Sequence, residues 1–251
     1  MTDGKRNKSP HEQVPQRVVN HYLAEIFSRR IGAGEKLPPE RELAATMKVD
    51  RTSLRVALKQ LQSMGLLDIR PGNGIYVKDY LKHAGMDFLR VLFSQEDEAV
   101  RELTSDRYVI DEVYEWWAAM MPEVLKLAAS RFSPRHLKTL SDLLDQELAS
   151  VGNKEKIVEL EVAEQDLVAE VANNMILLLV SNSSRPLRRK MVGIFVECID
   201  EGSLREFILA KKAMLEEFLC GQSEEKTAQA AARYRRILAE HRRLVRRSGP
   251  G

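Results

Sequence analysis

Apolar side chains in the first third of the chain follow helical spacing, and strand-like alternation comes afterwards. Four-residue steps over residues 11–31 predict an amphipathic helix, which the glycine-containing segment 32–34 ends. A short second helix is expected from Pro39 to near Lys48, and a third over residues 51–64. The apolar faces of the first and third helices consist of Val14, Val18, Tyr22, Ile26, Leu54, Leu58 and Leu61.

The alternation after the third helix predicts a small hairpin. Residues 67–70 and 75–78 alternate well enough to be strands, and the Pro-Gly-Asn-Gly sequence between them is typical of a tight turn. Asp50 precedes the third helix and is expected to cap its N-terminus. Because two short strands are not stable alone, they are expected to pack on the helices as a wing.

The rest of the chain predicts only helices. A linker helix over residues 80–93 is followed by a long apolar segment, 98–131, in which Pro122 predicts a kink or a break. The Ser133-Pro134 pair begins another helix, and Gly152-Asn153 ends it. Four more helices are expected over residues 154–172, 174–200, 203–220 and 223–247. Helices of this number and spacing predict an all-α, antiparallel bundle.

The composition agrees with a mainly α protein. Aromatic residues make up 6% of the chain and charged residues 30%, which is typical of a helix-rich protein. No apolar run approaches ~20 residues, so no membrane span and no membrane partner are predicted. The polar N-terminus does not resemble a secretory signal, and Cys198 and Cys220 have neither metal-binding nor disulfide spacing. A cytoplasmic location is therefore expected.

The charge distribution distinguishes the two ends of the chain from its middle. Residues 1–78 carry a net charge of +6, residues 79–232 carry −10, and residues 233–251 carry +6. A basic N-terminal part beside an acidic remainder favours a polyanionic partner for the N-terminal part.

The first turn of the third helix combines cations and hydroxyl groups. Arg51, Thr52, Ser53 and Arg55 are crowded there. A helix N-terminus fits the major groove of B-DNA, where arginine bonds guanine bidentately and hydroxyls reach phosphate or base edges. The alternative interpretation is a solvated polar face.

The residues of this region resemble a known family. PPERELA, followed by DRTSLRVALKQLQSMGLLDIRPGNGIYV, is similar to the winged helix-turn-helix of GntR-family bacterial transcriptional regulators, over about residues 31–78. One departure is Lys48, where the family usually has glycine; a positive φ there would cost roughly 1 kcal/mol. The resemblance implies DNA contacts from the positions matching Arg41, Arg51, Thr52, Ser53, Arg55 and Gly72.

The helical remainder resembles the FadR subfamily, whose C-terminal domain is an α-helical ligand-binding bundle. The similarity is clearest in LEVAEQDLVAEVANN, residues 160–174. One branch of the subfamily binds a divalent metal through an aspartate and three histidines. Because Glu161 and Gln165 stand where its first two ligands would be, no metal and no cofactor are predicted. The resemblance then implies a small acidic effector, with a fatty acyl-CoA favoured over another carboxylic acid.

Three residues are expected in the effector pocket. The resemblance places Arg107 there, although an interhelical salt bridge is the alternative. Asn174 is a second candidate, with helix capping as its alternative. Trp116 and Trp117 cannot both face the core, so one, taken as Trp116, is expected in the pocket or at a dimer interface.

These observations predict four segments. Residues 1–10 are expected to be disordered, 11–78 to form the winged helix-turn-helix, 79–95 the linker helix and 96–248 the effector-binding and dimerisation domain. The expected function is that of a homodimeric, ligand-responsive regulator that binds a pseudo-palindromic operator and controls lipid metabolism.

Two other classes of function are weighed against this one. Some GntR relatives carry an aminotransferase domain, but the helical remainder is too short for that fold and shows no nucleophile–base–acid set and no phosphate-binding loop, so no enzyme is predicted. A ligand-independent DNA-binding protein is the second alternative.

Overall fold

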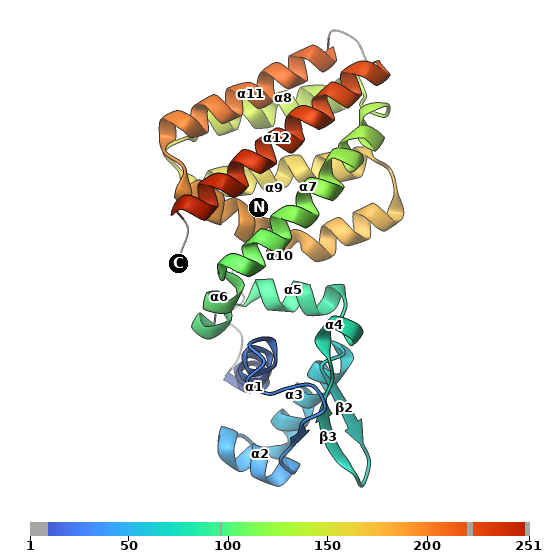
Figure 1. Ribbon diagram of the computed structural model, residues 1–251, viewed down its shortest axis with the longest axis vertical. Helices are drawn as coiled ribbons and strands as arrows, with labels where there is room; N and C mark the ends of the chain where they lie inside the picture. The colour runs from blue at the N-terminus through green and yellow to red at the C-terminus, as the bar shows by residue number, and fades with distance from the viewer. Residues whose placement is uncertain (1–9, 96, 220–222, 249–251) are drawn as a thin grey trace. The chain divides into compact units, whose positions relative to one another are not determined.

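The computed structural model describes residues 10–95, 97–219 and 223–248 (Figure 1). The chain divides into two compact units, Met1–Thr104 and Ser105–Gly251, called here the N-terminal and C-terminal units. The N-terminal unit thus includes the segment expected as a linker and continues beyond residue 96, where the second domain was expected to begin. The disorder expected for residues 1–10 falls outside the described residues, except for Pro10, which begins the first helix.

The N-terminal unit contains six helices and three strands among its described residues. The first helix ends earlier than the predicted residue 31, because Arg29 takes a positive φ of 58° ahead of the glycines. The helices are α1 (Pro10–Phe27), α2 (Glu40–Met47), α3 (Arg51–Ser63), α4 (Tyr80–His83), α5 (Met86–Ser94) and α6 (Glu98–Thr104); the strands are β1 (Lys36–Leu37), β2 (Leu67–Arg70) and β3 (Gly74–Val77).

The strands form an antiparallel sheet in the order β1-β3-β2. The predicted hairpin is confirmed, with Arg70 opposite Gly74 at its end. Strand β1 was not predicted, since two residues carry no alternation; its Lys36 pairs with Tyr76 of β3. Gly65 links α3 to the hairpin with φ 78°, and a Cβ there would lie 2.2 Å from the His83 carbonyl oxygen, so only glycine fits.

Helix α3 packs against α1, α2 and the hairpin, and its apolar face is the centre of the N-terminal core. Burial of each leucine or isoleucine side chain in this core contributes roughly 1.5–3 kcal/mol to folding. The fully buried side chains include Leu23, Leu54, Leu58, Leu61, Leu66 and Leu67.

Two predicted helix boundaries are wrong. The helix expected over residues 80–93 is divided into α4 and α5, because Gly85 adopts an extended conformation and helix-interior glycine is unfavourable. The segment 98–131 breaks at Asp106, whose side chain caps the next helix by accepting from the Tyr108 N–H at 2.8 Å. Pro122 lies inside that helix, is buried, and does not end it.

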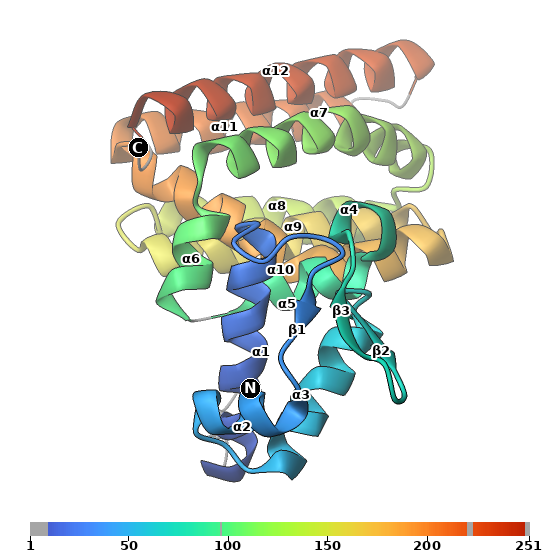
Figure 2. The same cartoon turned by 60° about the horizontal axis from the view of Figure 1, so that its bottom comes forward.

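The C-terminal unit is a bundle of six helices among its described residues, which confirms the predicted fold class (Figure 2). Helix α9 packs against α7, α8 and α10, while α12 lies beside α7, α10 and α11. The bounds are α7 (Arg107–Ala129), α8 (Pro134–Ala149), α9 (Lys154–Val171), α10 (Met175–Cys198), α11 (Glu201–Leu219) and α12 (Glu224–Ser248). None of the helices in the described ranges is long and apolar enough to span a bilayer.

Candidate nucleic-acid interface and helical cavity

The N-terminus of α3 is fixed by the predicted cap. Asp50 Oδ1 accepts from the Ser53 N–H at 2.9 Å, and Asp50 Oδ2 accepts from the Ser53 hydroxyl at 2.6 Å. These bonds hold the pKa of Asp50 below its ordinary value. Ser53 is 7% exposed, so its hydroxyl serves the cap in this structure, and a DNA contact from it would require that bond to exchange.

One face of α3 is exposed along its length. It carries Thr52, Arg55, Val56 and Lys59, which recur at helical spacing opposite the buried leucines. Val56 is 51% exposed and was not predicted as a site residue. An apolar side chain here suits the methyl group of thymine. The helical period itself could have identified it, because it falls between Arg55 and Lys59 on the polar side.

The arginines of α2 and α3 differ in their present partners. The guanidinium groups of Arg41 and Arg51 are exposed and have no hydrogen-bond or ion-pair partner among the described residues. Arg55 donates to Glu40 Oε2 at 2.8 Å, and both side chains are substantially exposed. Surface pairs of this kind contribute roughly 0–1 kcal/mol, so Arg55 can exchange Glu40 for a phosphate or a base.

The turn between α2 and α3 has a left-handed residue at Lys48, where the sequence departs from the glycine usual in the family that it resembles. Lys48 adopts φ 53° and ψ 49°. Arg17 of α1 donates to the Met47 carbonyl oxygen at 2.8 Å and thereby holds the end of α2. This contact positions α2 against α3 despite the unfavourable backbone of Lys48.

Two further cations lie around the Tyr76 ring: Arg70 of the wing, which also donates to Asp68 Oδ2 at 2.7 Å, and Lys36 of β1. The Arg70 guanidinium lies 4.8 Å from the centre of the Tyr76 ring, and Lys36 Nζ lies 5.6 Å from it. The Tyr76 hydroxyl donates to Asn73 Oδ1 at 2.7 Å. Gly72 has φ 73° with open space around it, which leaves its backbone accessible.

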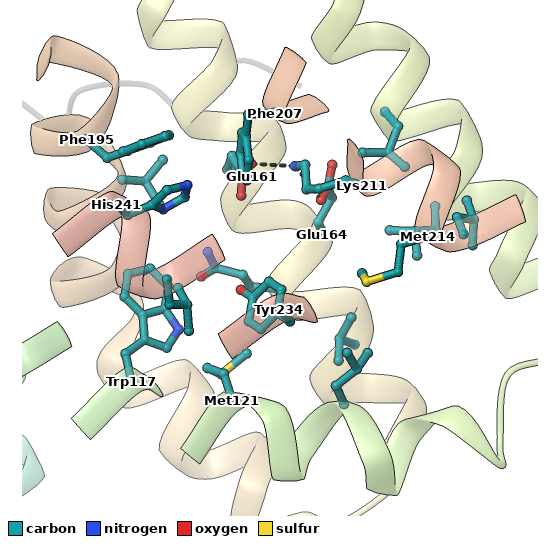
Figure 3. Close-up of a pocket in the computed structure, with 18 of the residues that line it drawn as sticks. Trp117, Met121, Glu161, Glu164, Phe195, Phe207, Lys211, Met214, Tyr234 and His241 are labelled. Carbon is teal, nitrogen blue, oxygen red and sulfur yellow. Dashed lines mark hydrogen bonds and ion pairs between the residues drawn. The ribbon is translucent and has the colours of Figure 1, made fainter. Parts of the chain in front are cut away.

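The C-terminal unit contains a partly open cavity of about 100 Å³ (Figure 3). All six helices of the bundle contribute side chains to its wall, and most of these are aliphatic, aromatic or methionine. The polar residues of the wall are Glu161, Glu164, Gln165, Lys211, Tyr234 and His241.

A buried ammonium group lies at the polar end of the cavity. Lys211 Nζ donates to Glu147 Oε2 at 2.8 Å, to Glu164 Oε2 at 2.9 Å and to Glu161 Oε1. Burial, together with the neighbouring carboxylates, raises the pKa of Glu147 to about 9. Burial likewise raises the pKa of Glu164 to about 7. Burial disfavours the charged form of Lys211, but the three carboxylates outweigh it and hold its pKa well above the ordinary value.

The three carboxylates also have the spacing of a cation site. One oxygen of each lies within 4.8 Å of the others. Lys211 Nζ is within hydrogen-bond distance of all three, so it takes the place a metal ion would need. A metal would fit only if Lys211 were displaced.

His241 forms the aromatic part of the same wall. Its ring stacks on Phe195 with centroids 3.5 Å apart and meets Phe207 edge-on at 4.6 Å. Burial, and then the charge of Lys211, lower the pKa of His241 to about 3. The imidazole is therefore neutral at physiological pH.

The three predicted effector residues do not line this cavity. Arg107 is exposed at the first position of α7. Asn174 caps α10, accepting from the N–H groups of Ile176 at 3.0 Å and Leu177 at 3.1 Å, which is the alternative the sequence allowed. Trp116 is 39% exposed, whereas Trp117 is 4% exposed and lines the cavity. Trp117, and not Trp116, therefore lines the cavity.

The basic C-terminal helix pairs with acidic residues of the same unit. Arg242 and Arg246 both bond to Asp111 of α7. Arg233 bonds to Glu217 of α11 at 2.8 Å. These contacts hold α12 against α7 and α11 and give partners to three arginines of that helix.

The N-terminal unit matches a known family, and parts of the chain are similar to curated proteins. Residues 15–77 match the model of the bacterial regulatory proteins of the gntR family. The HTH-type transcriptional regulator Mce2R of Mycobacterium tuberculosis is 32% identical over 142 residues, which are 57% of this chain and 55% of that protein. The fatty acid metabolism regulator protein of Edwardsiella ictaluri is 35% identical over 92 residues, 36% of this chain and 38% of that protein.

The chain thus spans about half the length, or less, of these curated relatives. A solved structure titled for Lar, which controls the expression of the Listeria monocytogenes agr system, covers 97% of this chain and 99% of that chain. Its TM-score is 0.53 at 15% identity, which shows a shared fold.

Proposed function

We propose that this chain, whose N-terminal unit is a GntR-family helix-turn-helix domain, is a bacterial transcriptional regulator that acts in the cytoplasm and binds a DNA operator. The observation that carries the proposal is the exposed N-terminal turn of α3. There Arg51 has a free guanidinium, and Arg55 is held only by a surface pair. Both are suited to bidentate contacts with guanine in the major groove.

The remaining contacts hold the domain on the duplex. Arg41 and Thr52 are exposed beside the same helix end, and Gly72 allows close approach of the wing backbone. Phosphate contacts of this kind fix register and orientation, while base contacts supply sequence preference. Lys36 and Arg70, which flank Tyr76, add cations to the wing.

The proposal includes a homodimer on a pseudo-palindromic operator. Two copies of α3 would enter successive major grooves, one helical turn apart. The C-terminal unit would supply the dimer contact. On α7, Trp116 and Met120 lie four residues apart on one exposed face, and large exposed apolar side chains of this kind favour association.

The cavity of the C-terminal unit is the proposed effector site. Its apolar wall suits an acyl chain, so a fatty acyl-CoA, controlling lipid metabolism in the manner of the FadR subfamily, is the effector that the sequence resemblance favours. A cavity of about 100 Å³ holds only a small part of such a molecule, so the CoA portion would lie outside it. Binding that prefers one arrangement of the regulator would shift its DNA affinity.

Mapping of bound DNA across the genome tests the proposal. The wild-type chain should enrich a short pseudo-palindromic sequence, and an Arg51→Ala/Arg55→Ala variant should lose that enrichment. Arg135→Ala, which removes an exposed cation from α8, should keep it. Enrichment of the same sites by the double variant would contradict the assignment of α3. Failure of every metabolite to change melting temperature or DNA affinity would instead favour a ligand-independent DNA-binding protein.

A further inference from the structure

The polar end of the C-terminal cavity contains a cation with no free donor. An ammonium group has three N–H donors. Those of Lys211 are all engaged, by Glu147, Glu161 and Glu164. Lys211 and these carboxyl groups are buried or nearly so, so solvent does not replace one of the bonds at low cost.

No other cation with a free donor faces the cavity from the described residues. His241 is neutral, as shown by its lowered pKa. The buried Arg188 is not among the lining residues; its guanidinium donates to Gln165 at 3.1 Å, to Asp166 at 2.7 Å and to the Ser181 carbonyl oxygen, while its Nε is buried without a partner among the described residues. A ligand carboxylate would therefore enter a site with an excess of carboxyl groups.

We propose that this cavity selects an uncharged ligand, a small apolar molecule with an amide or alcohol head group, and discriminates against the free carboxylate of the same length. This inference rests on the proposed function, because it takes the cavity as the effector site. An esterified acyl group is also uncharged at its carbonyl but offers only an acceptor, and a free carboxylic acid is excluded as the effector.

Unpartnered polar atoms in the wall define what the head group must offer. The Trp117 indole N–H and the Tyr114 hydroxyl are buried and have no partner among the described residues. Glu164 Oε1 and His241 Nε2 are likewise buried without a partner. A buried donor or acceptor that stays unpaired when a ligand binds weakens the complex. An amide or alcohol offers both a donor and an acceptor, whereas a carboxylate offers acceptors only.

The cavity volume limits the size of the ligand. An apolar protein cavity of roughly 150 Å³ holds one benzene-sized molecule. A cavity of about 100 Å³ therefore suits about four heavy atoms without expansion, and a six-carbon amide only with side-chain shifts. Met121, Met191 and Met214 in the wall permit such shifts, since methionine adapts its shape readily.

The test is calorimetric titration of the full chain with hexanamide, hexanoate and hexylamine at pH 7.5. The expected result is binding of hexanamide at least about tenfold tighter than that of hexanoate. Equal or tighter binding of hexanoate would overturn the proposal. Tightest binding of hexylamine would overturn it in favour of a cation-selective site, and binding of none of the three would overturn it as well.

Two variants of α9 test whether the carboxyl groups around Lys211 cause the preference for hexanamide over hexanoate. Glu164→Gln keeps the shape of the side chain and removes one carboxylate, so hexanoate should gain affinity relative to hexanamide by about tenfold. Glu159→Gln, an exposed site on the same helix that does not line the cavity, should leave the ratio unchanged. An unchanged ratio in Glu164→Gln, with a wild-type circular dichroism spectrum, would contradict the charge argument.

A second variant keeps the test independent of that substitution. Trp117→Phe removes one hydrogen-bond donor and preserves an aromatic ring, and it should weaken hexanamide about fivefold. These titrations contain no DNA, so the operator experiments report separately on the proposed function. Selective binding of hexanamide without operator binding would contradict the proposed regulator and support the selectivity of the cavity. Operator binding without that selectivity would support the regulator and contradict the cavity proposal.

Discussion

The candidate sites of the two units differ in the burial and pairing of their cations. In the N-terminal unit Arg41 and Arg51 are exposed and have no partner among the residues that the structure describes, and Arg55 is held by a surface pair. In the C-terminal unit Lys211 is buried and bonded to three carboxyl groups. Exposed cations remain available to a polyanion, whereas a buried, saturated cation orders the residues around it. The first arrangement suits DNA, and the second suits the inside of a ligand site.

The largest effect is expected from breaking the buried cluster. Lys211→Met leaves Glu147, Glu161 and Glu164 facing one another without a cation, so the free energy of unfolding should fall by roughly 3–5 kcal/mol at pH 7.5. Urea denaturation followed by circular dichroism measures it. The adjacent Lys212→Met, which removes a surface pair with Asp145, should change little. Equal losses in the two variants would remove the distinction between buried and exposed cations.

In the N-terminal unit, Gly65→Ala is expected to have the next largest effect. The new Cβ would meet the His83 carbonyl oxygen at 2.2 Å and force φ 78° on alanine, so the loss of stability should exceed about 2 kcal/mol. Gly72→Ala is the matched control, with φ 73° and open space around it. It should cost only the strain of the backbone, roughly 1 kcal/mol. Equal denaturation midpoints for Gly65→Ala and Gly72→Ala would show that the backbone shifts enough to relieve the contact with His83.

The pH dependence of stability sharpens the comparison. Glu147 and Glu164 have folded pKa values of about 9 and about 7, above the ordinary value of 4.5, so the folded state binds more protons than the unfolded state between those values. Their contribution to stability is greatest below about pH 4.5 and is lost as the pH rises to 9. Glu147→Gln should therefore flatten the fall between pH 5 and 9 in thermal denaturation, and Glu159→Gln should not. If stability fell with pH as steeply in Glu147→Gln as in the wild-type chain, Glu147 would be ionised in the folded state.

The smallest expected effect concerns the left-handed turn. Lys48→Gly relieves an unfavourable φ and should stabilise the chain by at most about 1 kcal/mol, because glycine also gains freedom in the unfolded state. Lys59→Gly, in the exposed interior of α3, should destabilise it by about 1 kcal/mol. If both substitutions destabilised equally, Lys48 would not be strained.

The same contrast explains how far the sequence could predict the structure. Asp50 and the wing glycines act through local backbone geometry, and their positions along the chain were sufficient to identify them. Lys48 stood out only because the family that the sequence resembles usually has glycine there. The Lys211 cluster joins α8, α9 and α11 over sequence separations of 47 to 64 residues. No local sequence pattern predicts contacts between residues so far apart in the chain. Trp116 and Trp117 are neighbours in sequence, so the choice between them depended on how α7 is rotated against the bundle.

The boundaries that were missed have a similar cause. Pro122 is a strong local signal, but packing in the bundle keeps α7 continuous through it. Asp106 is a weaker signal in sequence, and its capping bond places the break instead. Local signals therefore predicted the third helix, its cap and the hairpin, whereas the interior of the helical unit required tertiary contacts.

Operator affinity tests the central claim most directly. Fluorescence anisotropy would compare a mapped operator duplex with a scrambled duplex of the same length, at one fixed salt concentration. The wild-type chain should prefer the operator, and Arg51→Ala should reduce operator affinity by roughly 1–3 kcal/mol while scrambled DNA loses much less. Arg135→Ala serves as the charge-matched control. An operator preference that survives in Arg51→Ala and in the Arg51→Ala/Arg55→Ala double variant would contradict the account.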